Sequence, residues 1–173
     1  SAFDDLSLVQ LLANEGIDGL EKLPGGLKAK RELVAETIRS NVRRVIIDRR
    51  SVNPAYYDQM STLLEDVIER TKQDAENYED YLNQLVALAR GVFNPQMGTS
   101  YPEEVKTQAL AALYDNLGKD LELALRVDSA INDDRMDNWK GHRVKRLKVR
   151  NAIKSVLGDD DDLIDSILAI AGE

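Results

Sequence analysis

Residues 31 to 70 contain two stretches of helical periodicity that meet at Asn53-Pro54. In each stretch apolar residues recur three or four positions apart, a spacing that places them on one face of a helix. Asn53 can cap the second helix, and Pro54 suits its first position. We therefore expect an antiparallel helical hairpin at the centre of the fold. Its apolar stripes consist of Leu33, Val34, Ile38, Val42, Val45, Ile46, Tyr56, Tyr57, Met60, Leu63, Leu64, Val67 and Ile68.

The same spacing continues along the chain, and no stretch shows the alternation of a strand. Glycine and proline mark the ends of the periodic segments. The expected fold is all-α, an irregular bundle of about six to eight helices. Residues 1–26 are expected to form a short N-terminal helix and a Gly-rich connector, followed by a helical domain over residues 27–173. Beyond the hairpin of residues 31–70, helices are expected at about 77–91, 102–117, 119–131, 142–157 and 160–171.

Composition excludes several classes of function. The chain has 173 residues, no cysteine, one histidine and a net charge of −8. Disulfides, thiolate metal sites and multi-histidine sites are therefore impossible, and a general nucleic-acid coat is disfavoured because phosphate contacts need excess positive charge. No apolar run suggests membrane insertion or secretion, so we expect a cytoplasmic protein without a membrane partner. The start at Ser1-Ala2 suggests a piece of a longer protein.

Four short motifs could indicate chemistry, and each has a better structural explanation. Gly25-Gly26 lacks the flanking elements of a phosphate loop. Glu104-Val105-Lys106 resembles the end of a nuclease motif, but no strand precedes it, and Glu104 is expected in the first turn of a helix. The acidic run from Asp159 to Asp162 lacks the pattern of a calcium loop and is expected to cap a helix. His142 has no accompanying nucleophile. We predict no catalytic, cofactor-binding or metal site.

A basic segment near the end of the chain is the candidate contact site. The expected helix His142–Leu157 has an apolar side formed by Val144, Leu147, Ile153, Val156 and Leu157, and its other side is almost entirely basic. Such a cluster is either a solvated face or a contact for DNA phosphate or an acidic protein surface. The candidate residues are Trp139, Lys140, Arg143, Lys145, Arg146, Lys148 and Arg150.

Other conspicuous residues are expected to be structural. Tyr56, Tyr57, Tyr78 and Tyr81 lie on or beside apolar stripes and should pack in the core with their hydroxyl groups at its rim. A second set of arginines is expected to form ion pairs with Glu36 and Asp48. These arginines are Arg39, Arg43, Arg44, Arg49 and Arg50.

Residues 38 to 90 also resemble a known family. The phrases VRRVIIDRRSVNPAYYDQMSTLLEDVIER and YEDYLNQLVALAR are similar to the C-terminal helical region of the R subunit, the motor and endonuclease subunit, of type I restriction enzymes. The similarity lies in a helix ending in V-R-x-x-I-I-D, a start N-P-x-Y-Y-x-x-M-S-x-L-L and a following helix with Y-x-x-Y-L. It is looser at Trp139-Lys140 and in the segment VRNAIKSVL.

The resemblance implies a non-catalytic domain that assembles with the methyltransferase and specificity subunits of an ATP-dependent DNA-translocating endonuclease. The nuclease and translocase activities, with their ATP and Mg²⁺, would belong to other parts of the parent subunit. No helicase box, phosphate loop or complete nuclease motif occurs in this chain. An alternative is that the basic helix 140–150 contacts the DNA backbone during translocation.

Overall fold

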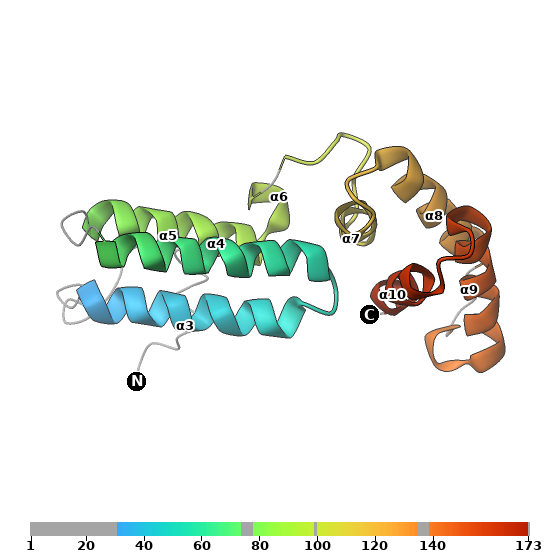
Figure 1. Cartoon of the computed structure of the whole chain (residues 1–173), viewed down its shortest axis with the longest axis horizontal. Helices are drawn as coiled ribbons and strands as arrows, with labels where there is room; N and C mark the ends of the chain where they lie inside the picture. Colours follow the sequence, from blue (N-terminus) through green and yellow to red (C-terminus); the bar gives the residue numbers. More distant parts are fainter. Residues whose placement is uncertain (1–30, 74–77, 99, 135–138, 173) are drawn as a thin grey trace. The chain divides into compact units, whose positions relative to one another are not determined.

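A computed structural model describes residues 31–73, 78–98, 100–134 and 139–172, and within these ranges the chain is all-helical. This confirms the predicted irregular all-α bundle (Figure 1). The predicted N-terminal helix and connector of residues 1–26 lie outside the described residues. The elements are α3 (Arg31–Arg49), α4 (Pro54–Gln73), α5 (Tyr78–Phe93), α6 (Pro95–Gly98), α7 (Gln108–Asn116), α8 (Leu121–Asp134), the 3₁₀ turn η2 (Trp139–Gly141), α9 (Arg143–Leu157) and α10 (Asp161–Ala171).

Within the predicted helical domain the structure distinguishes two compact units. The first consists of α3, the part of α4 from Tyr57 onward, α5 and α6. The second consists of Arg50–Tyr56 together with the helices from α7 to α10. None of the helices in the described ranges combines the length and apolar character that a bilayer crossing requires.

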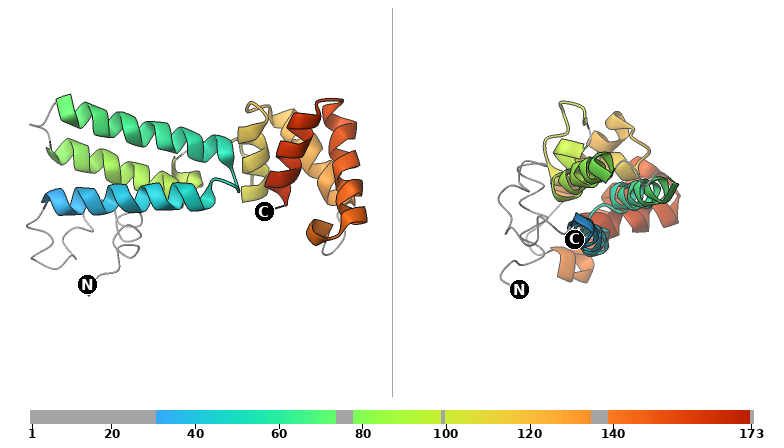
Figure 2. Two further views of the ribbon diagram at one scale, coloured as in Figure 1. Left: turned by 60° about the horizontal axis from the view of Figure 1, so that its bottom comes forward. Right: turned by 90° about the vertical axis from the view of Figure 1, so that its left-hand side faces the viewer.

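In the described part of the first unit, α4 runs antiparallel to α3 and α5 (Figures 1 and 2). Its core contains most of the apolar stripes predicted from the sequence, including the fully buried Ile38, Val42 and Leu64, whereas the predicted core residue Leu63 is 37% exposed. Tyr57 and Tyr81 are buried, and their hydroxyl groups bond at the edge of the core. Tyr57 donates to the Val92 carbonyl at 3.4 Å. The core assignment is thus confirmed for Tyr57 and Tyr81 and also for Tyr56, which is 1% exposed, whereas the side chain of Tyr78 lies outside the described part of the chain.

In the second unit the helices enclose a separate core. Helix α8 contacts α7 and α9, and α10 contacts α9 and α7, so that the four helices surround one apolar centre (Figure 2). Ala124, Val127, Ile153, Ile164 and Ile167 are completely buried there. Trp139, from η2, joins the same core. Gly158 ends α9 with φ +81°, a backbone conformation that favours glycine.

Asn53 holds the start of α4 within the second unit. Its side-chain oxygen accepts from the backbone N–H of Tyr56 at 3.3 Å, as expected for a cap. Its amide nitrogen donates to Asp115 at 2.8 Å, and Asn116 donates to its oxygen, also at 2.8 Å. Tyr101 completes the network by donating to Asp115 at 2.6 Å. Because Asn53 is only 6% exposed, these bonds satisfy a polar group that water cannot reach freely.

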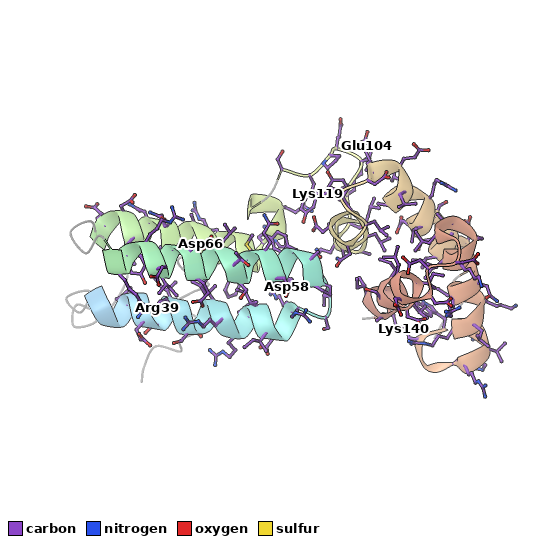
Figure 3. The ribbon with its side chains drawn as sticks, in the orientation of Figure 1. Arg39, Asp58, Asp66, Glu104, Lys119 and Lys140 are labelled. Carbon is purple, nitrogen blue, oxygen red and sulfur yellow. The ribbon has the colours of Figure 1, made fainter. Side chains whose placement is uncertain are left out.

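One helix boundary differs from the expectation. The helix expected at 102–117 begins only at Gln108, so Glu104 lies in a turn before α7 rather than in a first helical turn (Figure 3). The N–H of Val105 bonds to the Pro102 carbonyl at 3.0 Å and closes this turn. Thr107 then caps α7 by accepting from Leu110 N–H. The helix therefore does not begin at Pro102, because residues 102–105 form a turn and Thr107 provides the cap.

We expect Asn53→Ala to destabilise the second unit by about 2–3 kcal/mol, because it removes the cap and takes one hydrogen bond each from Asp115 and Asn116. Trp139 is the single tryptophan and lies in that unit, so its fluorescence during urea unfolding reports the change. The matched control is Asn151→Ala, at an exposed position of α9. Equal unfolding midpoints for the two variants would contradict a stabilising role for the network.

Candidate functional site

Helix α9 carries most of the candidate contact residues, and its buried side determines which of them reach the surface. Val149 and Ile153 are completely buried, and Ala152 beside them is nearly so. They face α8 and α10, the helices that α9 contacts. This stripe fixes the rotation of α9 about its axis, since turning it would expose two large apolar side chains.

The opposite side of α9 presents two apolar residues to solvent. Val144 is 59% exposed and Leu147 is 49% exposed. The sequence interpretation placed both on the buried side with Ile153, and this was wrong. Val144 precedes Ile153 by nine residues, about two and a half turns, so the two side chains point in opposite directions. That spacing is the signal by which the exposed pair could have been found.

Cations border this apolar pair. Arg143 and Lys148 are exposed and lie next to Val144 and Leu147 in the sequence. Neither makes an ion pair with any residue that the structure describes. We name the surface formed by Arg143, Val144, Leu147 and Lys148 the α9 outer face. It combines apolar area with positive charge, although the chain as a whole is acidic.

Two other predicted cations point toward α10. Arg150 donates to Asp165 at 3.1 Å and to Asp161 at 3.2 Å. These hydrogen bonds raise the pKa of Arg150. Arg146 is exposed, and its Nη1 lies 3.9 Å from the position that a Cβ of residue 172 would occupy, at the C-terminal end of α10. Arg150 is therefore engaged within the unit, whereas Arg146 lies where a helix end attracts positive charge.

The remaining candidates, in and around η2, have different surroundings. Trp139 is only 3% exposed and belongs to the core, so it is not on the surface with the cations. The reason is that the short η2 turn packs on α9 and directs the indole inward. Lys140 is exposed in the same turn (Figure 3), and Lys145 is half-buried. The structure thus brings only part of the predicted set to one surface.

The acidic run before α10 has a structural role, as predicted. Asp160 caps the helix by accepting from Leu163 N–H at 3.1 Å. Asp161 bonds to Arg150, and Asp159 lies 3.9 Å from the ammonium group of Lys154. No group of three or more His, Asp or Glu side chains among the described residues could hold a metal ion. His142, at the start of α9, is exposed and makes no side-chain cap bond.

The second set of arginines stabilises the first unit. Arg39 pairs with Glu36 and donates to Tyr81 at 2.6 Å. Burial lowers the pKa of Arg39, but hydrogen bonds with Tyr81 and Glu36 outweigh this effect and raise it. Arg49 donates to the Phe93 carbonyl at 3.0 Å, and its guanidinium lies 5.6 Å from the centre of the Phe93 ring.

The predicted pairing of this set with Glu36 and Asp48 is confirmed only in part. Arg43 reaches across to Glu65 on α4 at 3.1 Å, and Arg44 bonds to Asn41. The partners on other helices became accessible only when α3, α4 and α5 packed together.

The α9 outer face is therefore the better candidate for a contact site, because its cations form no ion pair with the described residues.

The rotation of α9 can be tested by stability. We expect Val144→Ser and Leu147→Ser each to change the free energy of unfolding by less than about 0.5 kcal/mol, because about half of each residue is already exposed to solvent. Ile153→Ala, on the buried side, should cost about 2–5 kcal/mol. Urea unfolding followed by Trp139 fluorescence measures all three variants. A large loss for Leu147→Ser would show that the outer face is packed.

Searches against protein-family models, curated proteins and solved structures found no match to this chain. Its function is therefore inferred from its own residues and geometry, together with the resemblance in residues 38 to 90.

Proposed function

We propose that this chain is a non-catalytic assembly domain, equivalent to the C-terminal helical region of a type I restriction enzyme R subunit. It docks onto the methyltransferase and specificity subunits through the α9 outer face. ATP and Mg²⁺ are bound by other parts of the parent subunit, which acts in the cytoplasm. The assignment of the parent rests on the resemblance in residues 38 to 90, and the assignment of the surface rests on α9.

The observation that carries this proposal is the exposure of Val144 and Leu147 between Arg143 and Lys148. Covering two half-exposed apolar side chains favours association with a protein, since a partner can exclude water from them. The flanking cations favour a partner surface with carboxylates and would increase the rate of encounter. A phosphate backbone offers the cations a partner, but it offers little to the two apolar residues.

The test measures binding of the chain to purified methyltransferase–specificity core without DNA. The double variant Val144→Asp/Leu147→Asp should raise the Kd by at least about tenfold, because it introduces charges where apolar contact is expected. The control is Leu125→Asp/Arg126→Glu, which changes an exposed apolar residue and an exposed cation on α8. Equal affinity of both variants and the unmodified chain would exclude the α9 outer face as the docking surface.

The alternative is a DNA-contacting role, which is favoured because Arg143, Arg146 and Lys148 form no ion pair with the residues that the structure describes. Three phosphate contacts would give log K against log salt a slope of about −2 to −3. Arg143→Glu/Lys148→Glu should then abolish binding to a DNA duplex, whereas Val144→Ser/Leu147→Ser should not change it. Absence of DNA binding at low salt would eliminate this role and leave the assembly proposal standing.

A further inference from the structure

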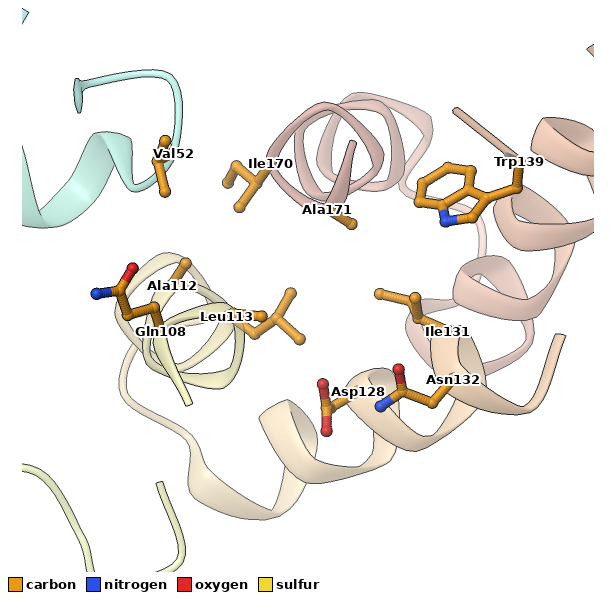
Figure 4. Close-up of a pocket in the computed structure, with 11 residues that line it drawn as sticks. Val52, Gln108, Ala112, Leu113, Asp128, Ile131, Asn132, Trp139, Ile170 and Ala171 are labelled. Carbon is orange, nitrogen blue, oxygen red and sulfur yellow. The ribbon is translucent and has the colours of Figure 1, made fainter. Parts of the chain in front are cut away.

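The second unit contains a pocket that the assembly role does not use. It has a volume of about 230 Å³ and lies among α7, α8, η2 and α10, with Val52 at one end (Figure 4). Its walls are mainly apolar side chains of the unit's core, Leu113, Ile131 and Ile170 among them. A cavity of about 150 Å³ is enough for benzene, so this pocket has room for an aromatic ring with a polar substituent.

Trp139 supplies an unused hydrogen-bond donor to this pocket. Its side chain lines the pocket, and only 3% of the residue is exposed. Its indole nitrogen donates to no residue of the chain that the structure describes. No buried side-chain nitrogen or oxygen among the described residues lacks a partner, so this N–H is not sealed away from solvent. Figure 4 draws it on the ring edge turned toward Ile131.

Two of the pocket's polar side chains lie on the side formed by α8. Asp128 and Asn132 line this wall, one turn apart, while Gln108 lies at the α7 end (Figure 4). Asp128 is half-buried and already interacts within the chain, and its carboxylate places negative charge on this wall, which disfavours a second negative charge nearby. The pocket therefore offers Trp139 as a donor, tolerates donors near Asn132 and disfavours anions.

We infer that this pocket binds a small aromatic compound that carries a carbonyl group and no negative charge. The ring fills the space between Leu113, Ile131 and Ile170, and the carbonyl oxygen accepts the indole N–H of Trp139. An amide substituent suits the site best, since its NH₂ group can donate to the oxygens of the α8 wall. A ligand that supplies an acceptor replaces water at the indole N–H with a hydrogen bond, and its ring gains apolar contact with the pocket walls.

Benzamide, benzoate and toluene form a matched set of probes for this inference. They share the phenyl ring and differ in having a neutral carbonyl, an anionic carboxylate or neither. Trp139 is the only tryptophan, so its emission reports binding in the pocket directly. Benzamide should change this emission saturably with a Kd of about 1 mM. Toluene should bind at least about threefold more weakly, and benzoate should not bind below about 10 mM.

Three variants and one control variant test the contacts. Ala109→Phe adds bulk at an exposed residue that lines the pocket and should abolish benzamide binding, whereas Ala169→Phe, an exposed position on α10 that does not line it, should leave binding intact. Asp128→Asn should allow benzoate to bind. Trp139→Phe removes the donor and should weaken benzamide about 3- to 10-fold, measured by saturation-transfer NMR because the fluorophore is lost. Circular dichroism establishes that each variant is folded.

Absence of a saturable response to benzamide in the unmodified chain would overturn the inference. Equal affinities for benzoate and benzamide would overturn the assigned charge preference, and unchanged binding by Ala109→Phe would place the ligand elsewhere. If Trp139→Phe does not fold, the comparison of benzamide with toluene decides whether the carbonyl contributes. None of these outcomes depends on docking to a methyltransferase.

Discussion

An α-helix of 3.6 residues per turn can bury only one stripe of its surface in a small bundle, and the rest of this structure depends on which stripe each helix buries. In α9 the stripe contains Val149 and Ile153. Once these residues are inside, Val144 and Leu147 have to remain outside, and the cations beside them remain with them. The packing of the core thus determines which residues form the candidate contact surface, although none of these surface residues belongs to the core.

Charge in this protein is local. The net charge is −8, yet α9 carries exposed cations that screening makes relevant only within about 8 Å at physiological salt. The acids of α10 engage Arg150 and leave Arg143 and Lys148 without an ion pair among the described residues. The negative net charge of the chain does not prevent this surface from binding an acidic partner, because a partner interacts mainly with the side chains within contact distance.

The second unit combines two polar features of opposite character. Around Asn53 every polar atom in the network finds a partner, which fits a structural role. In the pocket the indole N–H of Trp139 has no partner from the described protein, which fits a role in binding. Which donors bond within the protein and which remain open to solvent is visible only when the contacts are known.

The sequence by itself determined the helical class, the Asn53 cap, the acidic cap before α10 and most core residues, because these depend on periodicity and on contacts a few residues apart. It also identified the basic block. Only the tertiary structure decided that Arg150 is neutralised by α10, that Trp139 is buried beside a pocket and that Arg43 pairs with Glu65. Those outcomes require residues far apart in the chain to meet, and spacing along one helix carries no information about the helices that pack against it.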